Sequence, residues 1–175
     1  AAAEIDEIVV ATDDQRIMEA VENSPARGQM TAEDHASGSD RVAEVAADYK
    51  ADIVLNIQGD EPLITGADLD RGIRGMKQNP QLSVGTFKAP CPETEYEDHD
   101  VVKVVSRKDG RALYFSRSLV PYPRGEEAEI YQHIGIYLYR CEVLLEFVET
   151  PPSRLEKVEE LEQLRLLENG YDILL

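Results

Sequence analysis

Hard oxygen donors follow directly after a hydrophobic stretch at residues 53–62, which read IVLNIQGDEP. The apolar part is typical of a buried strand, and ligands of open parallel sheets bind just past the carboxyl ends of strands. Gly59 has no side chain, so the backbone can approach a ligand closely there. Asp60 is placed as a Mg²⁺ ligand would be, since this ion takes one or two carboxylates together with substrate phosphates. The alternative interpretation is an acidic turn.

A second polar segment, residues 30–41 with the sequence MTAEDHASGSDR, precedes a predicted helix. Polar and charged side chains surround its glycine, and free N–H groups at a helix N-terminus bind anions and polar ligand groups. A well-capped helix start is enough to explain Ser37 or Ser39 alone. That explanation leaves His35 and Arg41 without a role, so the segment is a candidate binding site.

Two further segments carry charged groups that could bind a ligand. Residues 113–117, LYFSR, end in Arg117, and a guanidinium binds a carboxylate or phosphate through paired hydrogen bonds. Residues 160–165, ELEQLR, place Glu162 at the border of an apolar helical stripe. Each signal is weak alone, because surface arginines and solvated helix faces are common.

The segment HIGIY, residues 133–137, is predicted to be a strand. Side chains two apart on a strand point to the same face, so His133, Gly135 and Tyr137 share one face. That face presents an imidazole, a gap and a phenol, which suits a hydroxyl-rich ligand. A half-buried aromatic strand is the alternative interpretation.

The elements that must position these groups alternate along the chain, which is typical of an α/β fold. We predict strands at 8–11, 29–31, 53–57, 82–87, 101–105, 111–115, 133–139 and 171–175. We predict a first helix that ends at residue 21 and further helices at 39–49, 67–78, 141–148 and 153–169. The strands at 101–105 and 111–115 are expected to form a hairpin, and 119–129 a surface loop.

The predicted helix 153–169 has the clearest boundaries. Ser153 and Glu156 form a capping-box pattern at its start, and Gly170 supplies the residue after its end. Its apolar stripe is expected to consist of Leu155, Val158, Leu161 and Leu164.

Composition excludes several classes of protein. The 175 residues carry a formal net charge of −17, which argues against non-specific binding to nucleic acid or to an anionic membrane. It does not exclude a small anionic substrate held by a few basic residues and a metal ion. No apolar run approaches the length of a membrane span, and the start AAAEIDEIVV lacks the basic region of a signal peptide. Cys91 and Cys141 form no CxxC pattern, so we expect free thiols in a reducing cytoplasm.

Taken in order, DHxSGxxR, QGDEP, LYFSR, HIGIY and LEQLR resemble one family. They are similar to the 3-deoxy-manno-octulosonate cytidylyltransferases, or CMP-Kdo synthetases, where Kdo is 3-deoxy-D-manno-octulosonic acid. The similarity runs from VVATDD to the final predicted strand. Each motif is weak alone, whereas five in register are specific.

The resemblance implies a nucleotide-diphospho-sugar-transferase-like α/β fold, a three-layer sandwich with a mixed sheet. It implies a single domain over residues 1–175, and we expect this segment to lack the first strand and the C-terminal elements of the family. It also implies a cytoplasmic, homodimeric, Mg²⁺-dependent enzyme that couples CTP to Kdo for lipopolysaccharide synthesis. We expect no nucleic-acid or membrane partner.

The resemblance also implies roles for individual residues. Asp60 matches a magnesium ligand of the family. Asp60 and Arg117 both match catalytic positions. The positions that hold the nucleotide are matched by His35, Ser37, Gly38, Arg41 and Gln58. The positions that hold Kdo are matched by Arg117, His133, Tyr137, Glu162 and Gln163.

The sequence differs from the family pattern in two ways. The family's Arg-, Ser- and Lys-rich loop, which holds the CTP triphosphate, and its second magnesium-binding Asp fall outside residues 1–175. Smaller differences are Ser39, where the family often has Thr, and Leu138, where small residues are frequent.

The implied reaction is an in-line attack of the Kdo anomeric hydroxyl on the α-phosphorus of CTP. Such a reaction depends on positioning and charge neutralisation, and the sequence names no general base. Two alternatives remain open: a cytidylyltransferase for another acidic sugar such as a sialic acid, and a catalytically silent binding or assembly module.

Overall fold

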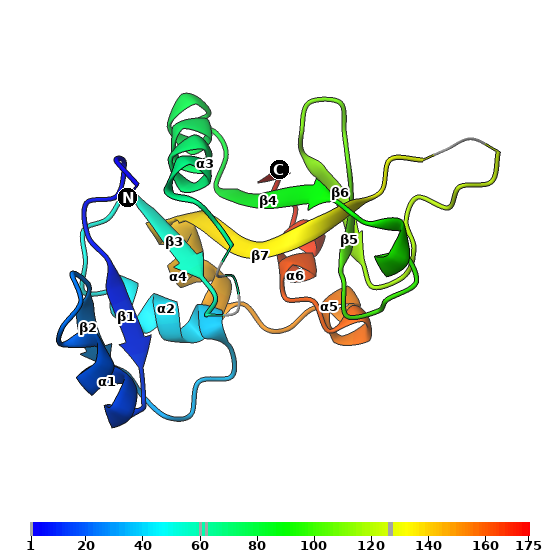
Figure 1. The fold of residues 1–175 in the computed structure, drawn as a ribbon. Helices are drawn as coiled ribbons and strands as arrows, with labels where there is room; N and C mark the ends of the chain where they lie inside the picture. Colours follow the sequence, from blue (N-terminus) through cyan, green and yellow to red (C-terminus); the bar gives the residue numbers. More distant parts are fainter. Residues whose placement is uncertain (1, 60, 62, 126–127) are drawn as a thin grey trace.

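A six-stranded mixed sheet with helices on both faces organises the chain (Figure 1). The computed structural model describes residues 2–59, 61, 63–125 and 128–175. The strands of this sheet are β3 (Ile53–Ile57), β4 (Val84–Pro90), β5 (Lys103–Ser106), β6 (Ala112–Ser116), β7 (Tyr131–Arg140) and β8 (Ile173–Leu174). The three layers and the mixed sheet agree with the fold class expected from the sequence.

The long strand β7 lies at the centre of the sheet. It pairs antiparallel with β4 on one side, and with β3 and β5 along the other. The hairpin of β5 and β6 and the parallel pairing of β8 with β4 complete the sheet. Strands β3 and β4 therefore run in the same direction, so the sheet is mixed rather than purely parallel.

A register shift interrupts the pairing of β7 with β4. Thr86 pairs with Tyr137, whereas the next residue, Phe87, pairs with Ile134. Two residues of β7, Gly135 and Ile136, therefore have no partner in β4. Such a bulge locally redirects side chains and is frequent next to functional sites.

The helices cover the two faces of the sheet unequally. They are α1 (Gln15–Val21), α2 (Gly38–Ala46), α3 (Gly66–Gln78), α4 (Cys141–Glu149), α5 (Arg154–Glu159) and α6 (Gln163–Glu168), with a short 3₁₀ turn at Glu93–Glu95. α3 packs on one face through Ile73 and Met76. A larger cluster from α2, α4 and α6 fills the other face. None of the helices in the described ranges is long and apolar enough to span a bilayer.

Gly72 allows α3 to lie close to the sheet. A Cβ at this position would lie 2.7 Å from Phe87 Cζ and 3.2 Å from Leu138 Cδ2. Any side chain here would therefore push the helix away from β4 and β7.

The N-terminal strands form a separate parallel pair, β1 (Val9–Thr12) and β2 (Arg27–Met30), which α1 connects. Asp14 caps α1 by accepting a hydrogen bond from the Arg16 N–H at 2.8 Å. The helix ends at Val21, as predicted, and the strand predicted at 8–11 is present at Val9–Thr12. The strand predicted at 29–31 begins earlier, at Arg27, so Gly28 lies inside β2.

Most predicted elements after residue 50 are confirmed within two or three residues of their bounds. The hairpin turns at Gly110, whose φ of 85° favours glycine. The strand predicted at 53–57 is present, but it is less buried than expected, since Ile57 is 42% exposed. Cys91 and Cys141 are free thiols, as expected.

The prediction of one helix over 153–169 is wrong. Ser153 and Glu156 do form the capping box, and Gly170 has the expected positive φ, but α5 ends at Glu159. Glu160 adopts the left-handed conformation with φ 53° and ψ 48°, and α6 begins three residues later. Of the predicted apolar stripe, Leu155, Leu161 and Leu164 pack in the core, whereas Val158 is 72% exposed.

A tertiary contact explains the break. The Arg117 guanidinium donates to the backbone carbonyl oxygens of Glu159 at 2.8 Å and Glu160 at 3.3 Å. A continuous helix would use carbonyls in its interior for its own ladder. The hydrogen bonds from Arg117, 43 residues away in sequence, therefore outweigh the helical propensity of this segment and end α5.

Replacing Glu160 with glycine should stabilise the fold. A left-handed L-residue costs about 1–2 kcal/mol, and the extra backbone entropy of glycine offsets about 0.5–1 kcal/mol of the relief. We therefore expect Glu160→Gly to raise the free energy of unfolding by about 0.5–1 kcal/mol in urea titrations. Lys157→Gly, inside α5, is the control and should lower it by about 1 kcal/mol. A similar loss in both variants would contradict the assigned backbone conformation.

Candidate functional site

An aromatic row on one face of β7 forms the centre of the candidate site. The rings of His133 and Tyr137 lie 5.4 Å apart, which confirms that they share a face. Tyr139 stacks on Tyr137 at 5.7 Å, and Phe115 of β6 meets the His133 ring edge-on at 4.9 Å. Burial raises the pKa of the Tyr137 phenol well above its ordinary value, so the phenol stays protonated.

A residue of the neighbouring strand β4 holds the ring of His133 in place. Its Nε2 lies 2.9 Å from the hydroxyl of Thr86, a residue that sequence reasoning missed. Burial lowers the pKa of the His133 imidazole to about 4, so this ring is neutral near pH 7. A neutral imidazole has one donor and one acceptor nitrogen, and a hydroxyl group can bind to either of them.

Glu61 fastens the loop after β3 to the bulge of β7. Its Oε1 accepts a hydrogen bond of 3.0 Å from the Gly135 N–H, and a Cβ on Gly135 would lie 3.4 Å from that oxygen. Glu61 is therefore fixed next to the aromatic row. The gap that glycine leaves in this row is next to a carboxylate rather than an open space.

A chain of hydrogen bonds joins the start of α2 to the start of α6. Ser39, fully buried, donates to Glu162 Oε1 at 2.6 Å and accepts from Asn56 Nδ2 at 3.2 Å. Gln58 Nε2 donates in turn to Asn56 Oδ1 at 3.4 Å. Three segments predicted as candidate sites therefore meet at one place. Asn56 was missed, although a lone amide inside the apolar run IVLNI was a visible signal.

Glu162 is the charged member of this network. Burial raises the pKa of its carboxyl, and the hydrogen bond from Ser39 opposes that shift. Beside it, Gln163 is 3% exposed on the first turn of α6. Both side chains are therefore held on the inner side of the break between α5 and α6, not on a solvated helix face.

Gly38 lies against Gln58 at the start of α2. A Cβ on Gly38 would be 3.0 Å from Gln58 Nε2 and 3.2 Å from Oε1. The adjacent Ser37 caps the helix by accepting from the Asp40 N–H at 3.2 Å and donating to the Asp40 carboxylate at 2.9 Å. The capping interpretation of Ser37 is thus confirmed, and Gly38 permits a close approach of β3 and α2.

His35 and Arg41 lie on the outer side of the same segment. His35 pairs with Glu44 in the second turn of α2, and hydrogen bonds from the Ala32 N–H and from His35 lower the pKa of Glu44. Arg41 donates to Asp13, at the end of β1, at 2.9 Å and also to Thr31. Both residues therefore connect the segment to its surroundings rather than joining the aromatic row.

Arg117 is well anchored at the end of β6. Besides the two carbonyls after α5, its guanidinium donates to the His99 carbonyl at 2.9 Å. An arginine has five N–H groups, so two donate to no described residue. Arg117 therefore holds three backbone segments together and still has N–H groups with which to bind an anion.

Two charged residues that the sequence did not single out, the buried Lys103 and the half-buried Glu159, hold Arg117 in place. Lys103, fully buried, donates to the carbonyls of Asp98, Val101 and Arg117, the last at 3.4 Å. Glu159 accepts from the Arg117 N–H at 2.9 Å and from the hydroxyls of Tyr114 and Ser116. The lysine inside the apolar run VVKVV was a signal that sequence reasoning did not use.

Asp60, predicted as the metal ligand, lies outside the described residues, as does Pro62. Of its described neighbours, Gln58 carries an amide oxygen, and a Cβ built on Gly59 meets no heavy atom within 4 Å. Among the described residues, no three His, Cys, Asp or Glu side chains gather closely enough to hold a metal ion.

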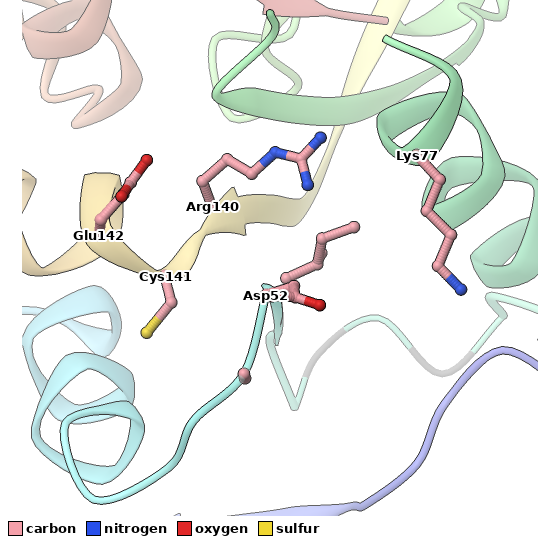
Figure 2. A pocket seen from close by; sticks show the side chains of 7 residues that line it. Asp52, Lys77, Arg140, Cys141 and Glu142 are labelled. Atoms are coloured by element: carbon pink, nitrogen blue, oxygen red, sulfur yellow. The ribbon is translucent and has the colours of Figure 1, made fainter. Parts of the chain in front are cut away.

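A cavity of about 280 Å³ lies at the other end of β3 (Figure 2). Lys77 and Arg140 contribute two positive charges to its lining, and Asp52 and Glu142 contribute two negative charges, so its charges balance. Lys77 is already paired with Glu4 at 2.6 Å. This cavity contains none of the predicted site residues. A second, of about 620 Å³, lies between α2 and α4 and includes His35.

Comparison with known proteins finds relatives along nearly the whole chain. The model of the cytidylyltransferase family matches residues 1–173. A 3-deoxy-manno-octulosonate cytidylyltransferase of Syntrophotalea carbinolica is 45% identical, over 98% of this chain and 73% of its own length. One of Acidobacterium capsulatum is 46% identical, over 99% of this chain and 71% of its own length.

A solved structure extends the likeness to three dimensions. It is the structure of CMP:2-keto-3-deoxy-manno-octonic acid synthetase complexed with CTP, which is 43% identical to this chain. The TM-score is 0.94, and the match covers 99% of this chain and 72% of the other. This similarity confirms the mixed α/β fold expected from the sequence.

The hydrogen bond between Ser39 and Glu162 should couple the two residues energetically. In a double-mutant cycle with Ser39→Ala and Glu162→Leu, measured by urea unfolding at pH 8, we expect a coupling energy of about 1–3 kcal/mol, because one partner is a carboxylate. The same cycle with Ser37→Ala is the control and should give a value near zero. Equal couplings in the two cycles would contradict the network.

Proposed function

Since the chain belongs to the cytidylyltransferase family, we propose that it transfers CMP from CTP to Kdo, giving CMP-Kdo and pyrophosphate for lipopolysaccharide synthesis. The observation that carries this proposal is the convergence on β7. A hydrogen bond joins Ser39 of the nucleotide segment to Glu162 of the sugar segment, and Asn56, which donates to Ser39, pairs with Tyr137 of β7.

We assign the sugar acid to the aromatic row. Arg117, with two N–H groups not used by described residues, pairs with the Kdo carboxylate. The sugar hydroxyls bind to His133, Tyr137, Glu162 and Gln163. Support comes from the neutral ring of His133 and from the inward placement of Glu162 and Gln163 beside it.

We assign the cytidine nucleotide to the segment at the start of α2, with His35, Ser37, Gly38, Arg41 and Gln58. The close approach of Gly38 to Gln58 supports a shared binding surface for β3 and α2. Arg41 and His35, each paired with a carboxylate, hold the loop before α2 in position. These two residues therefore act here mainly by shaping the loop.

Mg²⁺ is the proposed cofactor, held by Asp60 and substrate phosphate oxygens. When bound, this ion neutralises phosphate charge and polarises the α-phosphate. The described neighbours of Asp60 serve that site by holding the loop: Glu61 fixes the loop to β7, and Gly59 keeps the approach open.

The chain's own residues contribute position rather than covalent chemistry. The anomeric hydroxyl of Kdo attacks the α-phosphorus of CTP in line, and pyrophosphate leaves. Fixing both substrates converts a bimolecular encounter into an effectively unimolecular step, which is the main source of acceleration in this proposal. The buried aromatic row excludes water, so water does not compete with the Kdo hydroxyl for the α-phosphorus of CTP.

The homodimer and the cytoplasmic location implied by the resemblance belong to this proposal as well. The two free thiols are consistent with a reducing compartment. Sedimentation of the full-length protein measures the oligomeric state directly, and a monomer at micromolar concentration would contradict the dimer.

Release of pyrophosphate by the full-length protein tests the function. We expect turnover with CTP, Kdo and Mg²⁺, and a kcat/KM at least about 100-fold lower when a sialic acid replaces Kdo, because buried polar groups matched to one sugar discriminate strongly against another. Preference for the sialic acid would favour the alternative of a different acidic sugar. Nucleotide binding without turnover on any sugar acid would favour a silent binding module.

The same assay tests the metal assignment. Asp60→Ala should lower kcat by about 100-fold or more, since it removes the carboxylate assigned to the ion. Asp52→Ala is the matched control. Asp52 is an exposed aspartate just before the first residue of β3, and its replacement should leave kcat unchanged. Near-normal turnover of Asp60→Ala would show that the magnesium ligand lies elsewhere.

A further inference from the structure

The hydroxyl of Thr86 has three close polar neighbours, all on β7. Its Oγ1 lies 2.7 Å from the Ile136 carbonyl oxygen, 3.2 Å from the Ile134 carbonyl oxygen and 2.9 Å from His133 Nε2. Thr86 is 4% exposed, so water cannot substitute for these partners. The bulge at positions 134–136 creates this arrangement, because it brings two carbonyls toward one side chain of β4.

Only one assignment of protons satisfies this group. A threonine hydroxyl has a single proton, and carbonyl oxygens can only accept. If that proton pointed at His133, two carbonyl oxygens would face the hydroxyl oxygen with no hydrogen between them. The proton therefore goes to the carbonyls, with Ile136 as the nearer acceptor. The hydroxyl oxygen must then accept from His133 Nε2, which carries the proton of the ring.

We propose that Thr86 is a positioning residue that fixes His133 in the Nε2–H tautomer and so makes its Nδ1 a hydrogen-bond acceptor for a hydroxyl group of the sugar acid. Among the hydrogen bonds of the described residues, none uses His133 Nδ1. The choice of tautomer by the partner of the other nitrogen is a general property of histidine. The low pKa of His133 agrees with a neutral ring, although the tautomer itself follows from the geometry.

This assignment deepens the proposed function, on which it rests, by specifying what the site selects. An acceptor nitrogen binds an O–H or N–H group and disfavours a carbonyl or carboxylate oxygen at the same point. His133 therefore distinguishes a polyhydroxylated sugar acid from an analogue that carries a keto or methoxy group there. Arg117 binds the carboxylate, and the two recognitions are chemically independent.

The tautomer is measured directly by ¹⁵N NMR of the histidine-labelled full-length protein near pH 7.5, with the His133 signal assigned by its loss in His133→Gln. We expect a protonated Nε2 and an unprotonated Nδ1 in the unliganded protein. A protonated Nδ1, or a charged ring, would overturn the proposal. This readout does not depend on catalysis, so it remains decisive even if CTP and Kdo give no turnover.

Substitution of Thr86 adds a kinetic test. Thr86→Val keeps the shape and removes the hydroxyl, so we expect a mixture of tautomers and a KM for Kdo raised about 10-fold, the equivalent of one hydrogen bond, with the KM for CTP within about twofold of the original. Thr86→Ser restores the hydroxyl and should recover both the single tautomer and the original KM for Kdo. Thr150→Val, the control, removes a hydroxyl at the end of α4 that donates to the Glu146 carbonyl at 2.9 Å, and should change neither the tautomer nor the KM for Kdo.

The outcomes separate the possible failures. If Thr86→Val keeps the original tautomer and KM, or if Thr86→Ser behaves like Thr86→Val, the positioning role is wrong. If the wild-type protein has the expected tautomer but turns over no Kdo, the proposed function fails while the role of Thr86 in fixing the ring stands.

Discussion

The irregular backbone at the centre of β7 is the constraint on which the site depends. A buried N–H or carbonyl group must find a partner, and two residues of β7 have none in β4. Side chains take over: Glu61 accepts from the Gly135 N–H, and Thr86 donates to carbonyls on either side. The residues that satisfy the bulge are also those that fix the loop after β3 and the ring of His133, so the fold and the site share the same hydrogen bonds.

A second set of contacts holds the surrounding segments at the correct distance. Ser39 and Glu162 are 123 residues apart in sequence, and their hydrogen bond joins the start of α2 to the start of α6 on the same face of the sheet. Arg117, supported by Lys103 and Glu159, ends α5 early and turns Glu162 inward. The charges therefore act locally, by organising loops around one strand, although the chain as a whole is strongly acidic.

Much of this could be predicted from the sequence, and the failures have physical causes. Period-2 alternation placed His133 and Tyr137 on one face, and turn and cap residues marked the hairpin and Ser153. The break at Glu160 was hidden, because a tertiary contact from Arg117 overrides helical propensity and no local signal records it. Thr86 was missed for the same reason: a threonine in a strand looks ordinary until a bulge in another strand brings two carbonyls to it.

The most direct test of the central claim is a crystal structure of the full-length protein with Mg²⁺, Kdo and a CTP analogue that cannot release its pyrophosphate group. We predict the Kdo carboxylate at Arg117, its hydroxyls at His133, Tyr137, Glu162 and Gln163, and the metal ion at Asp60. Kdo bound anywhere else, such as in the cavity at the other end of β3, would contradict the assignment of the active site to the bulge of β7.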